Sequence, residues 1–307
     1  MKKLLLIGVS EKTHTIQRIV EELKKVGFNF DFFRWSELVF TSGVLWAKNK
    51  KIDLGAYSAA LLDSPGYNLV QKNPFGLRKK VIASINLSNE LNLIGSILRD
   101  KAKFIVNGEA ILKYPYYNKF SQSYIFGLKN IPSIKTIHVS DNEPEKVQKI
   151  LTKFHFRYPI VVKKSSGGMG LGVFKVGSKK ELGTFLKNKR SANLVFQPYL
   201  KNDGDYRVLV LAGKSLGIMK RKAASGKWKN NFALGGSVEK YIDPEMERFS
   251  EKVCRDLKLD LAGLDVFKIK NKYLVIEVNL FPCFEGFEKV HPGVNVAKKI
   301  VNLLKDK

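Results

Sequence analysis

Residues 159–176 read PIVVKKSSGGMGLGVFKV, and this stretch decides the fold. Its apolar start, Pro159–Lys163, predicts a strand that presents a lysine near its end. A turn of serines and glycines follows, and Val173–Val176 predicts a second strand. The predicted hairpin has serine and glycine amides that can close over phosphate groups, although a mobile turn without a ligand is the alternative. It is no P-loop, because GxxxxGK[ST] leading into a helix is missing.

Side chains that can hold a metal ion occur in two predicted strands further along, Gly263–Phe267 and Leu274–Asn279. Asp265 lies in an apolar run, while Glu277 and Asn279 are two positions apart and so face the same side of one strand. We expect the two strands to pair. Mg²⁺ prefers oxygen ligands, and lone buried carboxylates are costly, so these residues are candidate ligands. A hydrogen-bonded pair at a strand edge is the alternative.

Between the hairpin and these strands, several polar groups lie at the ends of predicted strands. Leu194–Leu200 predicts a strand running into a connection, and Asp205-Tyr-Arg207 opens another that continues to Leu211. The strand Leu216–Met219 returns and ends in three cations, Lys220–Lys222. These cations indicate an anionic ligand or a solvated face.

The N-terminal part predicts a different architecture. An apolar run at Lys3–Val9, a helical period over Ile16–Val26 and a strand at Phe28–Phe33 form a βαβ opening, with Gly27 at a C-cap position. This opening indicates a parallel sheet covered by helices. GxGxxG does not follow the first strand, which disfavours a dinucleotide-binding unit. Further elements are expected as two strands and one helix, at Ala59–Asp63, Phe104–Val106 and Asn89–Leu98.

Composition excludes several classes of protein. The 307 residues are 44% hydrophobic, enough for packed cores, and 54 Lys+Arg against 28 Asp+Glu give a net charge of +26. The two cysteines form no CxxC, and neither HExxH nor GxSxG occurs. No apolar run approaches bilayer length, and no signal-peptide cleavage site follows the first residues, so we expect a cytoplasmic protein without a membrane partner. The charge is spread along the chain and favours polyanions, or is a lysine-rich background.

The ordered set of these segments is similar to the ATP-grasp ligases, and among them to the RimK-like amino-acid ligases. The resemblance covers roughly residues 105–305. Its motifs are Tyr158–Lys163 with the glycine hairpin, Phe196–Leu200, Gly204–Arg207, Lys229–Asn231 with Gly235-Gly236, Ala262–Asp265, Ile276–Pro282 and Glu285–Lys289.

The resemblance implies an α/β (α+β) class chain with an ATP-grasp fold and an N-terminal parallel-sheet domain. We expect an N-terminal α/β domain over residues 1–113 and a central ATP-grasp subdomain with the glycine hairpin over 114–196. A C-terminal subdomain with the metal site is expected over 197–307. The first 100 residues resemble the domain that precedes ATP-grasp modules only in pattern.

The resemblance also implies the cofactors and their ligands. ATP is expected with two Mg²⁺ ions, Mn²⁺ being an alternative, and Asp265, Glu277 and Asn279 match the metal ligands unchanged. The matching nucleotide-binding residues are Lys119, Lys163, Ser166, Gly167, Gly168, Gln197, Pro198, Tyr199, Leu200, Asp205, Lys229, Asn230 and Asn231. The family usually has acidic residues at Asn118 and Pro198 and an arginine at Lys229. Pro198 keeps its carbonyl, so backbone acceptance from adenine survives.

The implied reaction is ATP-dependent amide formation through an acyl phosphate that an amine attacks. Lys163 and Arg221 are the expected catalytic residues, and Arg207 and Arg221 are expected to hold substrate carboxylates. The substrates would be a glutamate-like amino acid and an amine or carboxylate acceptor, such as an acidic protein or peptide, a carrier or a cofactor. Two alternatives stay open: a glutathione-synthetase-like small-molecule ligase, and a non-catalytic nucleotide- or RNA-binding protein. Nucleic acid is compatible with the charge but not required.

Overall fold

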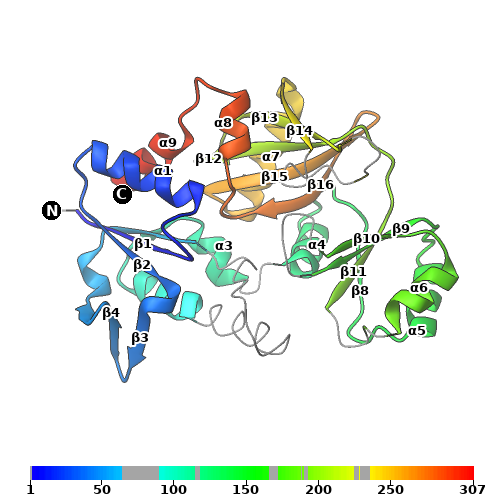
Figure 1. The fold of residues 1–307 in the computed structure, drawn as a ribbon, viewed down its shortest axis with the longest axis horizontal. Coiled ribbons are helices and arrows are strands. Elements are labelled where there is room, and N and C mark those ends of the chain that lie inside the picture. Colours follow the sequence, from blue (N-terminus) through cyan, green and yellow to red (C-terminus); the bar gives the residue numbers. More distant parts are fainter. Residues whose placement is uncertain are drawn as a thin grey trace.

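The computed structural model describes residues 2–63, 90–114, 118–165, 172–187, 189, 193–224, 228 and 236–307. These residues form a mixed α/β structure built around four sheets (Figure 1). Among the described residues, none of the helices combines the length and the apolar character needed to cross a membrane.

The N-terminal sheet is parallel, with strand order β2-β1-β6-β7. Leu4 and Leu6 pack on one face and Leu5 and Ile7 on the other, which explains the continuous apolar run. One face carries helix α1 and the other carries the helix over residues 90–100. The predicted βαβ opening is thus confirmed, in β1 (Leu4–Gly8), α1 (His14–Lys25), β2 (Phe30–Arg34), β6 (Ala59–Leu62) and β7 (Phe104–Ile105).

The end of α1 shows why the chain turns where it does. The Gly27 N–H donates to the Lys24 carbonyl and the Phe28 N–H donates to the Leu23 carbonyl, the two bonds of a Schellman motif. Gly27 has φ +62°, a left-handed conformation that glycine adopts without strain. The C-cap expected from the sequence is confirmed.

A small antiparallel sheet, which the sequence analysis did not predict, follows β2. It has the order β3-β4-β5 and lies beside two 3₁₀ turns. Its elements are η1 (Trp35–Glu37), β3 (Leu38–Thr41), β4 (Val44–Ala47), β5 (Lys50–Ile52) and η2 (Leu54–Ala56).

The central sheet has the order β10-β9-β11-β8, and its strand pairs are antiparallel. Lys163 pairs with Val173, so the two predicted strands and their antiparallel pairing are confirmed; residues 166–171 of the turn lie outside the described residues. Ile160 and Val162 pack under two helices, whereas Val161 and Lys163 alternate onto the other face. The elements here are α3 (Gly108–Lys113), α4 (Lys119–Leu128), β8 (Ile137–His138), α5 (Pro144–Lys153), β9 (Ile160–Lys164), β10 (Val173–Val176), α6 (Lys179–Leu186) and β11 (Leu194–Pro198).

The C-terminal sheet is antiparallel, with the order β14-β13-β12-β15-β16. The expected pairing of Gly263–Phe267 with Leu274–Asn279 is confirmed as part of β15 and β16. Helix α7 and part of α4 cover one face. The elements are β12 (Asp205–Leu211), β13 (Lys214–Lys222), β14 (Ser237–Tyr241), α7 (Pro244–Leu257), β15 (Leu261–Ile269), β16 (Lys272–Asn279), α8 (Glu285–Val290) and α9 (Val296–Lys305).

One hydrophobic core joins the two ends of the chain. Leu4 and Leu6 of the N-terminal sheet belong to the same buried cluster as Leu209 of β12 and Ile300 of α9. Figure 1 shows α9 lying beside α1, far from it in sequence. The domain boundaries after residues 113 and 196 stay predictions, but this core shows that the parts share buried surface.

Asn107 connects the N-terminal sheet to the C-terminal sheet by hydrogen bonds. Its side-chain amide donates to the carbonyls of Leu261 and Leu280 at 2.7 and 2.8 Å. Its Oδ1 accepts from the Asp260 and Leu261 N–H groups at 2.7 and 3.0 Å. Asn107 is 2% exposed and has φ +59°. An asparagine suits this position because it makes the four hydrogen bonds and also tolerates the left-handed backbone conformation.

We expect Asn107→Ala to lower the free energy of unfolding by about 3 kcal/mol, because buried backbone groups lose their partners and alanine is strained at this φ. Urea denaturation measures this. Asn107→Gly is the matched control: it relieves the backbone strain but not the lost bonds, so it should recover only a minor part. Equal stability of all three proteins would contradict the role of these bonds.

Asp63, directly after β6, gives the stability a pH dependence. Burial raises the pKa of Asp63 from 3.8 to about 7, and the Val9 N–H that hydrogen-bonds to the carboxylate only partly opposes this. The folded state therefore binds more protons than the unfolded state between pH 4 and 7, and its stability falls as pH rises through that window.

We expect Asp63→Asn to be more stable than the wild type at pH 8, on the order of 2–4 kcal/mol, and equally stable below pH 4. Thermal and urea unfolding across pH 4–8 measure this: Asp63→Asn should lose less stability than the wild type as the pH is raised. Asp53→Asn, on an exposed turn, serves as control. If the difference in stability between Asp63→Asn and the wild type does not vary with pH, Asp63 is not buried in its protonated form.

Candidate functional site

Charged side chains from four neighbouring strands lie on one face of the C-terminal sheet. Asp205 pairs with Arg221 across β12 and β13, and Arg207 pairs with Asp265 across β12 and β15. Asp265 in turn pairs with Glu277 across β15 and β16. Because directly opposed residues in antiparallel strands point to the same side, this register collects five charged groups on one surface.

Asp265 is the centre of this group. Its Oδ1 accepts from Arg207 Nε at 2.8 Å, and its Oδ2 accepts from Arg207 Nη2 and Arg221 Nη2, each at 2.9 Å. Arg221 Nε also donates to Asp205 Oδ1 at 2.6 Å. Asp265 is 8% exposed and Arg221 4% exposed, so these ion pairs are shielded from water.

The two arginines determine the ionisation of the buried acids. Burial would raise the pKa of Asp265, but Arg207 and Arg221 outweigh it and hold the pKa at about 2. For Asp205, burial and the neighbouring Asp265 charge outweigh Arg221, and the pKa is raised. The pKa of Arg221 is raised by both carboxylates despite its burial. Asp265 and Arg221 therefore stay charged at neutral pH.

Lys163 brings the central sheet into the same site. Loss of solvent lowers the pKa of Lys163 to about 8, and the positive charge of Lys119 acts in the same direction. The carboxylates of Glu277, Asp265 and Asp205 oppose this shift. Lys163 is thus close enough to these groups for their charges to act on its pKa, although the groups are far apart in the sequence.

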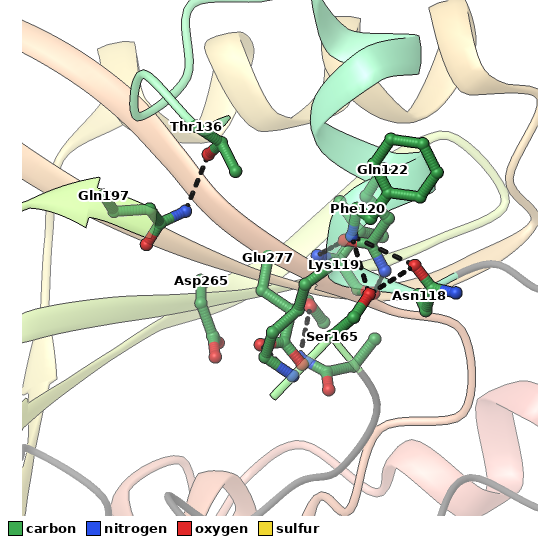
Figure 2. Close-up of polar contacts among 12 residues, drawn as sticks. Asn118, Lys119, Phe120, Gln122, Thr136, Ser165, Gln197, Asp265 and Glu277 are labelled. Atoms are coloured by element: carbon green, nitrogen blue, oxygen red, sulfur yellow. Dashed lines mark hydrogen bonds and ion pairs between the residues drawn. The ribbon is translucent and has the colours of Figure 1, made fainter. Parts of the chain in front are cut away.

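Helix α4 places a second lysine there. Lys119 Nζ lies 3.2 Å from Glu277 Oε2, and the Lys119 N–H donates to the Ser165 carbonyl at 3.0 Å (Figure 2). Asn118 caps α4 by accepting from the Phe120 and Ser121 N–H groups at 3.0 and 3.1 Å. The Ser165 hydroxyl donates to Asn118 Oδ1 at 2.8 Å. The asparagine at this position thus fixes the start of α4 against the end of β9.

Two residues with no role in the sequence analysis position the site. Gln122 is buried, and its side-chain amide exchanges 2.9 Å hydrogen bonds with the Val278 backbone, between Glu277 and Asn279. Ser165 joins β9 to α4 as described. The sequence around Gln122 does not indicate this role, because a glutamine inside a helix is ordinarily exposed. For Ser165, the only local signal is that its partner Asn118 is a residue type that favours helix N-caps.

The predicted adenine hinge follows β11. Gln197 donates from Nε2 to Thr136 Oγ1 at 2.8 Å, which fixes its side chain (Figure 2). The Tyr199 N–H donates to the Pro159 carbonyl at 3.3 Å, and the Leu200 carbonyl accepts from the Asn202 amide. Lys175 Nζ lies 3.8 Å from the centre of the Tyr199 ring, a cation–π contact.

The three predicted metal ligands lie on one surface. Glu277 and Asn279 are two residues apart in β16, and Asn279 pairs with Gly263 while Glu277 pairs with Asp265. Asn279 Nδ2 donates to the Gly263 carbonyl at 3.2 Å, which leaves its Oδ1 as an acceptor. Two carboxylates and an amide oxygen suit Mg²⁺. Within the described residues, no group of three His, Cys, Asp or Glu side chains has metal-binding geometry, and the metal site stays a prediction.

Six predicted site residues lie outside the described part of the chain: Ser166, Gly167, Gly168, Lys229, Asn230 and Asn231. The structure brings together the others of the phosphate and metal group, which are Lys119, Lys163, Asp205, Arg207, Arg221, Asp265, Glu277 and Asn279. What they bind stays a prediction.

The comparison with protein families agrees with this arrangement. The RimK-like ATP-grasp domain family matches residues 118–304, more than half of the chain. The chain belongs to the RimK-like ATP-grasp family.

Known relatives extend the comparison. The "Coenzyme gamma-F420-2:alpha-L-glutamate ligase" of Methanocaldococcus jannaschii is 33% identical over 194 residues, which cover 61% of this chain and 65% of that protein. The matching part spans about half to two thirds of the length of such curated relatives.

Two solved structures share the fold over nearly the whole chain. The ATP-grasp ligase PsnB complexed with minimal precursor, Mg and ADP has a TM-score of 0.68 at 17% identity, covering 98% of this chain and 97% of that one. The macrocyclase MdnC from Microcystis aeruginosa, bound with precursor peptide MdnA, has a TM-score of 0.70 at 15% identity, covering 99% and 100%. The expected fold class is confirmed.

Replacement of Arg221 tests the buried ion network. We expect Arg221→Met to lower the free energy of unfolding by about 3–5 kcal/mol, because Asp205 and Asp265 lose a shared cation in a buried site. Lys222→Met is the matched control, since Lys222 and its partner Glu239 are exposed and should contribute less than about 1 kcal/mol. Urea unfolding without nucleotide compares the two; similar effects would contradict a buried network.

Proposed function

We propose that this protein is an ATP-dependent carboxylate–amine ligase. It transfers the γ-phosphoryl group of ATP to a substrate carboxylate, and an amine displaces phosphate from the resulting acyl phosphate to form an amide. The observation that carries the proposal is the 3.2 Å contact of Lys119, on α4, with Glu277, which pairs across the sheet with Asp265 of the buried Asp265–Arg207–Arg221 network.

The site chemistry supports ATP with Mg²⁺ as its partners. Asp265, Glu277 and Asn279 would hold the metal, with a pair of Mg²⁺ ions as the finer proposal and Mn²⁺ as an alternative. Bound Mg²⁺ supplies neutralisation of phosphate charge. The PsnB structure with Mg and ADP shares this fold.

The positions of the other site residues suggest which part of the substrates each would contact. Lys119, Lys163 and Arg221 direct positive charge at the site of phosphoryl transfer and stabilise the charge that develops there. Arg207 forms a bidentate pair with Asp265, and it would exchange this pair for a substrate carboxylate. Gln197, Pro198, Tyr199 and Leu200 would hold adenine, with Asp205 at the nucleotide.

Six further residues, which lie outside the described part of the chain, are also proposed to contact the nucleotide. These contacts are Ser166, Gly167, Gly168, Lys229, Asn230 and Asn231. Glycine amides over the phosphates would exclude water from an acyl phosphate, which is hydrolysed if water reaches it.

Glutamate, or another amino acid, is the proposed substrate joined to an acceptor. The Methanocaldococcus jannaschii relative is named an alpha-L-glutamate ligase, and the MdnC structure contains a precursor peptide. A net charge of +26 would attract an acidic protein or peptide acceptor over long range. The coenzyme in the name of the first relative favours a second candidate, a ligase that modifies a small cofactor.

ADP release measured across amino acids and acceptors tests the proposal. Release that needs Mg²⁺, an amino acid and an acceptor together supports a ligase, and mass spectrometry of the product identifies the amide. Tight ATP binding without release in any combination would favour a non-catalytic nucleotide-binding protein. Salt-sensitive RNA binding that Asp265→Ala leaves unchanged would do the same.

We expect Glu277→Gln to lower the rate of ADP release at least about 100-fold, because the amide keeps the shape but loses the charge that holds the metal. Glu239→Gln, exposed on β14, is the control and should retain the wild-type rate. Raising the Mg²⁺ concentration should partly restore the Glu277→Gln rate. Full activity of Glu277→Gln at low Mg²⁺ would remove Glu277 from the proposed metal site.

A further inference from the structure

Helix α4 exposes a stripe of large apolar side chains next to the site. Phe120, Tyr124 and Leu128 are 38%, 65% and 68% exposed. Their spacing of four residues places them along one face of the helix, about 12 Å from end to end. The other face is buried through Gln122, Ile125 and Phe126. Phe120 also packs on His138, with 4.2 Å between the ring centroids. Tyr124 and Leu128 are therefore the most open part of this outer face.

Gly127 lies on the same outer face. A Cβ atom added at Gly127 would meet nothing within 4 Å, so no internal contact requires a glycine. Glycine inside a helix is less favourable than alanine. A glycine beside Tyr124 and Leu128 allows another chain to approach the helix backbone closely. This pattern of large apolar residues around a glycine fits a docking face better than a solvated one.

The charge around the stripe restricts its partner. Helix α4 has no acidic residue, and Lys119 and Lys129 stand at its two ends. Residues 101–140 contain six lysines and one acidic residue, Glu109. A second copy of the chain would bring like charges together, whereas an acidic polypeptide would be attracted. The charge complementarity therefore favours an acidic partner over self-association.

We propose that the α4 face formed by Phe120, Tyr124, Gly127 and Leu128 docks an amphipathic segment of an acidic polypeptide acceptor. The face begins one residue after Lys119, whose ammonium group pairs with Glu277, so a chain bound along α4 leads directly to the reaction site (Figures 1 and 2). The anchoring residues would be apolar side chains at helical spacing, as in helix-in-groove recognition. This proposal rests on the proposed ligase function, because only a ligase has an acceptor to bind.

Direct binding tests the proposal without turnover. The probe is a fluorescein-labelled, glutamate-rich peptide of about 16 residues with leucines at i, i+3, i+4 and i+7. Its control has the same composition with the leucines spread around the helix. Fluorescence anisotropy at about 50 and about 300 mM salt gives the affinities. We expect the wild type to bind the amphipathic peptide at least about tenfold more tightly than the control, and less tightly at high salt.

Two variants test the stripe, and a third serves as a control at another exposed apolar position. Tyr124→Ser/Leu128→Ser removes the apolar anchors, and Gly127→Leu blocks close approach while leaving room for the new side chain within the fold. Both should weaken binding at least about tenfold, and Gly127→Leu should not lower the melting temperature. Ile242→Ser, 74% exposed between β14 and α7, is the matched control and should bind like the wild type.

The other outcomes overturn the proposal. No binding by the wild type, or equal binding by all variants, removes the docking role. A large fall in melting temperature for Tyr124→Ser/Leu128→Ser assigns the stripe to packing within the chain. A dimer in sedimentation velocity that these variants abolish assigns it to a second copy. Because Mg-ATP binding by each variant is measured separately, loss of peptide binding with intact nucleotide binding distinguishes this proposal from failure of the ligase function.

Discussion

The buried carboxylate of Asp265, held between two guanidinium groups, is the interaction on which the site depends. Arg207 and Arg221 come from adjacent strands and reach Asp265 only because β12 pairs with β13 on one side and β15 on the other. A shift of one residue in either register would turn these side chains to the opposite face. The fold and the chemistry of the site are thus fixed by the same strand pairing.

The network also sets acidic side chains among the cations of the site in a strongly basic chain. Lys119 and Lys163 add positive charge, and Glu277 and Asp205 add negative charge, within reach of the two arginines. Lys119, Arg207 and Arg221 each pair with a carboxylate, which limits the cost of removing these charges from water. An incoming anionic group therefore exchanges partners with groups that are already oriented, and little reorganisation is needed.

The sequence predicted those parts of the structure that depend on short-range patterns. The parallel opening follows from Leu4–Gly8 and the period of α1, and the glycine hairpin and the pairing of β15 with β16 follow from runs bounded by turns. The β3-β4-β5 sheet was missed because its strands have three or four residues and no clear alternation. Gln122 was missed because its role depends on which strand passes α4, and that is a tertiary property.

The core shared by the two ends of the chain limits how the protein can be divided. The family match begins at residue 118, yet Leu209 of β12 and Ile300 of α9 are buried against β1 and α1. A shorter polypeptide starting there would present this apolar surface to water and would lack the Asn107 bonds to Leu261. We therefore expect the segment that the family model matches to fold poorly without the first hundred residues, so a fusion or truncation should keep them.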